Sequence, residues 1–170
     1  MATAQLLRTF HEAATGFVPS AGAAWRRFEG GLGVGEIVCH GDVGPHNTVY
    51  RHGLPVGFID WDTIRPNHPM VEFGAAAWKY VPLADEASFE ASDFGARPAL
   101  ARRLALFAGA YGAHDPDEVR WALHQAKQRS VDEMRYFPVT PAQGAAMLRL
   151  VATELEWLDR ALDELVAEID

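Results

Sequence analysis

Hydrophobic residues recur at helical spacing from the first residues of the chain. Leu6, Leu7 and Phe10 would share one face of a helix, and Gly16 supplies a stop signal. The pattern therefore predicts a helix over residues 4–16. Charged residues interrupt this stretch, so it lacks the apolar core of a signal peptide.

The second half of the sequence carries the same helical pattern in longer stretches. These predicted helices cover residues 70–80, 97–111, 115–136 and 140–166. The third has the strongest start signal, because Asp115 can cap the helix and Pro116 stands at its first position. Thr140 and Pro141 give the fourth helix a similar start, and Gly112 closes the second.

Three short runs with β-forming residues lie between the first helix and the others. They cover Glu36–Cys39, Thr48–Arg51 and Pro55–Ile59. Gly53 lies between the last two runs and can adopt the positive φ that a tight hairpin requires. The pattern predicts a mainly α fold with small β-hairpins (α+β). We expect a single domain over residues 1–170, which is long enough to bury one core.

Composition narrows the range of partners. The sequence is 49% hydrophobic and 22% charged, as is typical of a globular protein. Its formal net charge of −8 argues against nucleic-acid binding and against an anionic membrane surface, since both need clustered Lys and Arg. No stretch approaches the roughly 20 apolar residues of a membrane span. An acidic surface suits a cationic ligand, and the single cysteine, Cys39, fits a reducing cytoplasmic location.

The residues with the clearest chemistry lie around the predicted hairpin. Asp42 follows the first strand, Asn47 comes five residues later, and Asp60 ends the last strand. Because a hairpin brings its two ends together, Asn47 and Asp60 should lie side by side with Asp42 nearby. Mg²⁺ prefers oxygen ligands and takes few of them from protein when phosphates complete its shell. One carboxylate can then deprotonate a hydroxyl while the amide and the second carboxylate hold the metal, as phosphoryl transfer requires.

The sequence around these residues resembles a known family. The stretch from His40 to Asn47 reads H-G-D-x-x-x-x-N, and residues 59–62 read I-D-x-D. Both segments resemble the catalytic and metal-binding loops of the aminoglycoside phosphotransferase and choline kinase group, which is related to the protein kinases. The likeness extends over about residues 1–80 and implies the C-terminal lobe of a protein-kinase-like fold.

The resemblance gives each residue of the motif a role. Asp42 would be the catalytic base, and His40 would brace the catalytic loop. Asn47 and Asp60 would bind Mg²⁺ and, through it, the co-substrate ATP. Asp62 would either add to the metal ligands or cap the segment that follows, and both alternatives stay open.

Half of the family's nucleotide site has no counterpart in this sequence. In the family, an N-terminal lobe covers ATP and supplies a strand lysine to its phosphates. Here no lysine precedes Lys79, and the glycines at 30, 31, 33 and 35 lack the G-x-G-x-x-G spacing. We therefore expect the N-terminal lobe to be absent, which would leave an apolar face where it rests.

Two functions agree with this pattern. The first is a phosphotransferase that moves the γ-phosphoryl group of ATP to an alcohol substrate, such as an aminoglycoside-like compound, and that is incomplete without the other lobe. The second is a non-catalytic kinase-like lobe that binds a metal, a ligand or a protein. In either case a second copy or a partner chain would cover the face left by the missing lobe. A shortened gene product is a third alternative.

Overall fold

The computed structural model describes residues 1–26, 28–91, 95–133 and 139–169. Within these ranges the chain is mainly α-helical with two small antiparallel sheets. The helices are α1 Ala2–Ala14, α2 Pro69–Tyr80, α3 Glu86–Ala91, α4 Leu100–Tyr111, α5 Pro116–Glu133 and α6 Pro141–Val166. The strands are β1 Ile37–Cys39, β2 Thr48–Arg51, β3 Leu54–Phe58 and β4 Arg65–Asn67. Two 3-10 turns, η1 Pro45–Asn47 and η2 Trp61–Thr63, flank the β2–β3 hairpin.

Most predicted elements match the observed ones to within three residues. The expected end of the third of the later helices, near residue 136, lies outside the described residues. The sequence did not predict α3 or β4. Strand β4 consists of Arg65, Pro66 and Asn67, which have low strand propensity, and it is extended because it pairs with β1.

The helix ends follow the start and stop signals of the sequence. Thr140 accepts a hydrogen bond from the backbone N–H of Gln143, and the Gln143 side chain accepts one from the N–H of Thr140, which makes a capping box. Gly112 ends α4 with a φ of 92°. Local sequence therefore fixes where these helices lie along the chain.

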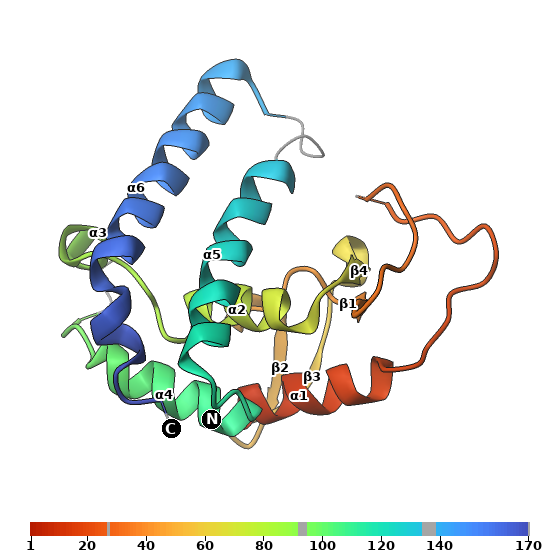
Figure 1. Cartoon of the computed structure of the whole chain (residues 1–170), viewed down its shortest axis with the longest axis horizontal. Coiled ribbons are helices and arrows are strands. Elements are labelled where there is room, and N and C mark those ends of the chain that lie inside the picture. The colour runs from red at the N-terminus through yellow and green to blue at the C-terminus, as the bar shows by residue number, and fades with distance from the viewer. Residues whose placement is uncertain (27, 92–94, 134–138, 170) are drawn as a thin grey trace.

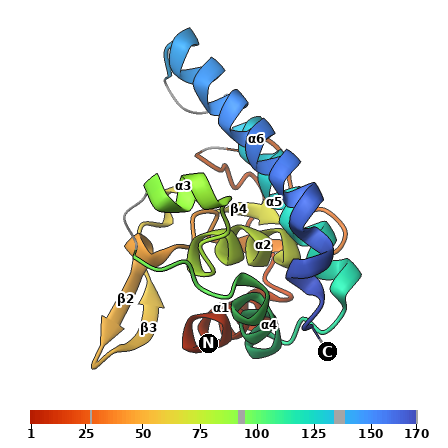
Figure 2. The ribbon, with the colours of Figure 1, turned by 90° about the vertical axis from the view of Figure 1, so that its left-hand side faces the viewer.

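The two sheets are separate. Strand β1 pairs with β4, so that Cys39 lies opposite Arg65. Strand β2 pairs with β3 in a hairpin whose turn contains Gly53, with a φ of 77°. This hairpin projects away from the helices (Figure 2). It carries the chain from Asn47 back toward Asp60.

One cluster of buried apolar residues connects α1, α2, α4, α5 and α6. Helices α5 and α6 run side by side, and α1 packs against α4 (Figure 1). Helices α2 and α5 approach closely at Gly74, where a Cβ would come within 2.2 Å of the carbonyl oxygen of Ala122. Val43, in the loop after β1, joins the same cluster. The loop is therefore anchored to the helical core.

No helix in the described part of the chain combines the length and apolar character needed to cross a bilayer.

Candidate active site

The candidate site begins where β1 ends and the chain turns. Gly41 has a φ of 87°, which favours glycine. A Cβ at this position would lie 2.2 Å from the carbonyl oxygen of Thr63. The hydroxyl of Thr63 donates to the carbonyl of His40 at 3.0 Å. This close approach of two segments requires glycine and sets the direction in which residues 42–47 leave the strand.

Glu72, in the first turn of α2, holds the backbone of this loop. Its carboxylate accepts hydrogen bonds from the N–H groups of His40 at 3.2 Å and Gly41 at 2.5 Å. It also pairs with Nε2 of His11 at 2.8 Å. Burial raises the pKa of Glu72, but the contacts with His11 and the two N–H groups outweigh it and hold the pKa below its usual value. The ionised carboxylate therefore ties α1, α2 and the loop together.

His40 is fully buried between the loop and the returning strand. Its Nδ1 accepts a hydrogen bond from the N–H of Asp42 at 3.2 Å. In the neutral ring the proton then lies on Nε2, which donates to the carbonyl of Ile59 at 2.9 Å. The ring also packs against Trp61, with centroids 4.4 Å apart. His40 thus connects Asp42 to the segment that carries Asp60.

Asp42 presents a partly exposed carboxylate to three donors. Nζ of Lys79 lies 2.5 Å from Oδ1. Nδ2 of Asn47 lies 3.0 Å and Nε2 of His46 lies 3.3 Å from Oδ2. Burial raises the pKa of Asp42, but Lys79 and His46 lower it by more, so the pKa lies below its usual value. The carboxylate is therefore ionised at neutral pH and able to accept a hydrogen bond.

Asn47 joins Asp42 to the returning strand. Its side chain is buried, and its backbone carbonyl accepts a hydrogen bond from the N–H of Ile59 at 3.0 Å. The Nδ2 atom of the Asn47 amide donates to Asp42, so the Oδ1 atom points away from Asp42. No described residue donates a hydrogen bond to Oδ1. Every fully buried side-chain polar atom in the described ranges has a partner, so Oδ1 is not completely buried.

Asp60 follows Ile59 directly and begins η2. Its backbone is left-handed, with φ 62° and ψ 66°, a region that aspartate enters more readily than most residues. The side chain is exposed and makes no hydrogen bond or ion pair with the described residues. The structure thus brings Asn47 into contact with the residue that precedes Asp60, and it leaves the Asp60 carboxylate uncommitted.

Asp62 differs from Asp60 in having a partner. Its carboxylate forms an ion pair with Arg26, which lies in the long loop between α1 and β1. Both side chains are largely exposed. Before it could bind a metal, Asp62 would have to leave Arg26.

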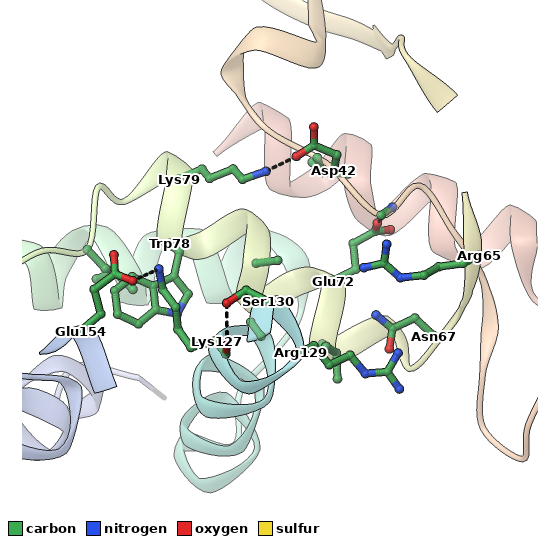
Figure 3. Close-up of a pocket in the computed structure, with 16 residues that line it drawn as sticks. Asp42, Arg65, Asn67, Glu72, Trp78, Lys79, Lys127, Arg129, Ser130 and Glu154 are labelled. Atoms are coloured by element: carbon green, nitrogen blue, oxygen red, sulfur yellow. Dashed lines mark hydrogen bonds and ion pairs between the residues drawn. The ribbon is translucent and has the colours of Figure 1, made fainter. Parts of the chain in front are cut away.

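A cavity of ≈ 250 Å³ opens beside Asp42 and is shared by α2, α5, α6 and β4 (Figure 3). Its wall runs from Asp42 and Lys79, past Trp78, to Lys127 on α5 and Glu154 on α6. Of the residues assigned a role from the sequence, only Asp42 lines this cavity. A small molecule held here would therefore lie next to that carboxylate.

Two residues of this site were missed in the sequence. Glu72 carries a recognisable signal, because it is the one charged residue in the apolar stretch 70–78 and is buried in the structure. An acid inside an apolar helix face usually has a buried partner. Lys79 carries no such signal, since it is far from Asp42 in the sequence and only the packing of α2 brings them together.

The sequence comparison identifies the family to which this site belongs. Residues 3–122, more than half of the chain, match the phosphotransferase enzyme family. The chain belongs to this family. The matched range includes Asp42, Asn47 and Asp60, and it confirms the resemblance found in the two loop segments.

A second comparison is with one individual protein of known name. The chain is 36% identical over 109 residues to the trifolitoxin immunity protein of Rhizobium leguminosarum bv. trifolii. The aligned part is 63% of this chain and 42% of that protein, so the chain spans less than half of the relative's length. No solved structure matches the chain.

Proposed function

We propose that this chain is the acceptor- and metal-binding lobe of an ATP-dependent phosphotransferase that acts on a hydroxyl group of a small molecule. The proposal depends on one observation, the contact between Asp42 and Asn47 next to the returning strand that leads to Asp60. Membership of the phosphotransferase family supports phosphoryl transfer as the reaction class.

In this proposal Asp42 is the catalytic base. Lys79 and Asn47 fix its carboxylate, so it can accept a hydrogen bond from the acceptor hydroxyl and align that oxygen with the γ-phosphorus. The hydroxyl proton passes to Asp42 as the new P–O bond forms and the bond to the ADP oxygen breaks. Phosphoryl transfer depends mainly on positioning and charge, which a fixed carboxylate supplies. His40 is a positioning residue, since it acts through the backbone of Asp42 and Ile59.

Asn47 and Asp60 are the proposed Mg²⁺ ligands, and Asp62 is a further candidate. Oδ1 of Asn47 and the carboxylate of Asp60 are hard oxygen donors, and neither has a partner among the described residues, which fits the preference of Mg²⁺. Held by these residues, the ion would offset the negative charge of the ATP phosphates. Asp62 would join them only after release from Arg26.

We also propose that residues 1–170 form one domain equivalent to the C-terminal lobe of a kinase-like fold. The core cluster that joins helices from α1 to α6 supports one domain. A nucleotide-covering lobe would be supplied by a longer polypeptide or by another chain. The exposed apolar side chains of the hairpin offer a surface for it, notably Val49, Leu54 and Val56. The need for Mg²⁺ and ATP leads us to propose a cytoplasmic location.

The direct test is calorimetric titration of ATP, up to millimolar concentration, with and without Mg²⁺. We expect binding that requires Mg²⁺ and that Asp60→Asn weakens by about tenfold or more. Asp163→Asn is the matched control, because Asp163 is an exposed carboxylate of α6 that pairs with Arg120. The absence of Mg²⁺-dependent binding, or equal binding by both variants, would refute the proposal.

A binding module without catalysis is the second candidate. The exposed apolar hairpin favours it, because such a surface suits a protein partner. The relative from Rhizobium is an immunity protein, a name that does not specify a reaction. Asp42→Asn separates the two candidates in a transfer assay, since it should abolish phosphorylation while leaving Mg²⁺-ATP binding intact.

A further inference from the structure

The cavity beside Asp42 is rich in basic side chains, although the chain as a whole has a net charge of −8. Four of the fifteen Lys and Arg residues line it: Arg65, Lys79, Lys127 and Arg129. The described lining includes three acids: Asp42, Glu72 and Glu154. Among the described residues, this lining therefore carries one more positive than negative charge, whereas the whole chain has a net charge of −8.

All three acids already have partners that use their charge, since Asp42 pairs with Lys79 at 2.5 Å. Glu72 accepts from two backbone N–H groups and pairs with His11. Glu154 pairs with Lys127 at 2.7 Å. The third, Asp42, is the carboxylate that the proposed reaction directs at the acceptor hydroxyl. Little negative charge on this lining remains to attract a cation.

The one corner of the cavity that would suit an organic cation is already filled. An aromatic face next to a carboxylate is a favourable site for an ammonium group. Here the face of Trp78 and the carboxylate of Glu154 hold the ammonium of Lys127, with Nζ 4.0 Å from the ring centroid. A cationic substrate would first have to displace Lys127.

Arg129 is placed differently from Lys127. It forms an ion pair with Glu36, outside the cavity lining, in which Nη2 and Oε1 lie 3.6 Å apart, longer than a hydrogen bond. Its side chain lies on the same side of the cavity as Arg65, with Asn67 between them (Figure 3). The Arg129 side chain is about one-third exposed. A guanidinium can form two parallel hydrogen bonds with a carboxylate or a phosphate.

We infer that this cavity binds the acceptor alcohol and selects one that carries an anionic group, either a carboxylate or a phosphate, which pairs with Arg129. The inference rests on the proposed function, which places the acceptor hydroxyl at Asp42. A volume of ≈ 250 Å³ suits a small polar molecule, since pockets for drug-sized ligands measure roughly 300–1,000 Å³. This inference differs from the expectation of a cationic ligand that the chain composition suggested.

The experiment compares four small alcohols that differ in their charged group. Glycerol, glycerol 3-phosphate, D-glycerate and choline are titrated into the protein at low salt, without ATP or Mg²⁺, and affinities are measured by calorimetry. We expect at least one of the two anionic alcohols to bind about tenfold or more tightly than glycerol and choline. Comparison of glycerol 3-phosphate with D-glycerate tells a phosphate site from a carboxylate site.

Arg129→Gln tests which residue recognises the anion. It should weaken binding of the preferred anionic alcohol by about 10-fold to 100-fold and leave glycerol unaffected. Arg120→Gln is the matched control, because Arg120 lies on the same helix, pairs with Asp163 at 2.7 Å and does not line the cavity. Circular dichroism establishes that both variants fold.

Three results would overturn the inference: equal affinity for all four alcohols, tightest binding of choline, or equal losses in the two variants. The titration of Mg²⁺-ATP is read separately, so the two hypotheses can fail independently. Anion selectivity without Mg²⁺-ATP binding would support the anion site and refute the proposed reaction. Mg²⁺-ATP binding without anion selectivity would refute the inference alone.

Discussion

The two segments that carry the candidate site are held in different ways. The backbone of residues 40–42 is fixed by buried groups, since Glu72 binds two of its N–H groups and His40 binds a third. The segment 60–62 is attached through Trp61, whose ring packs against His40 and Phe10, and its two carboxylates are exposed. Residues 40–42 are thus held in place by the fold before any ligand binds. Residues 60–62 instead present carboxylate oxygen atoms that are free or weakly paired.

This difference fits the two roles that we propose. A catalytic base must be aligned before the reaction, and the protein achieves this with hydrogen bonds that are shielded from water. Metal ligands need less alignment in advance, because carboxylate oxygen atoms can move into place around Mg²⁺ when it binds.

Removal of the Glu72 side chain should give the largest loss of stability. Glu72→Ala leaves two buried N–H groups and His11 without an acceptor, so we expect the free energy of unfolding to fall by about 3–5 kcal/mol. Urea denaturation measures this loss. A decrease below about 1 kcal/mol, the size expected for an ordinary exposed contact, would contradict the claim that this loop is fixed from within the core.

Gly41→Ala should also destabilise the loop, through a clash. The added Cβ meets the carbonyl of Thr63, and overpacking of this kind costs about 1–3 kcal/mol in addition to the cost of positive φ. Gly53→Ala is the control, because Gly53 has a similar φ of 77° with nothing within 4 Å. The difference between the two variants in urea denaturation isolates the clash, and equal losses would show that Thr63 moves aside.

Low pH should weaken the contacts that the Glu72 carboxylate makes with His11 and the loop. The pKa of Glu72 is lower in the folded chain than its ordinary value of 4.5, so its stabilising effect is complete above about pH 4.5. The effect is lost as the pH falls through the lower, folded-state pKa. Stability measured from pH 7 to pH 3 should therefore fall more steeply in the wild type than in Glu72→Gln, which cannot titrate. Parallel curves would show that Glu72 does not contribute to acid sensitivity.

The exposed segment should tolerate substitution with little effect on stability. Asp60→Asn keeps the size of the side chain and its tolerance of left-handed φ, and Arg26→Ala removes an exposed ion pair. Each should change the free energy of unfolding by no more than about 0.5 kcal/mol. Thermal melts without Mg²⁺ test this. A loss of several degrees in either variant would mean that this segment supports the fold.

Local sequence predicted the elements that carry their own signals. Helix α6 begins at the Thr140–Pro141 signal with its capping box, and Gly112 ends α4 as expected. Strand β4 could not be predicted in this way, because its Arg-Pro-Asn sequence is extended only through pairing with β1. Helix α3 was missed because it is short and lacks a repeated apolar pattern.

The candidate site likewise combines residues that local sequence indicated with residues that only tertiary contacts bring together. The spacing of Asp42, Asn47 and Asp60 was visible in the sequence, because a hairpin returns the chain to where it began. Glu72 was visible only as an acid in an apolar stretch, without an indication of what it binds. The Lys79 contact and the basic cavity had no local signal, since their residues come from four separate elements.

The sequence by itself determined the family, the hairpin and the order of the oxygen-bearing residues around it. These follow from short-range periodicity and spacing, which local backbone geometry translates directly into structure. Tertiary structure alone decided which partners those residues meet: Lys79 against Asp42, Glu72 beneath the loop, and Lys127 on Trp78. Such contacts depend on how helices pack across a shared core, and packing joins residues whose distance along the chain carries no information about their distance in space.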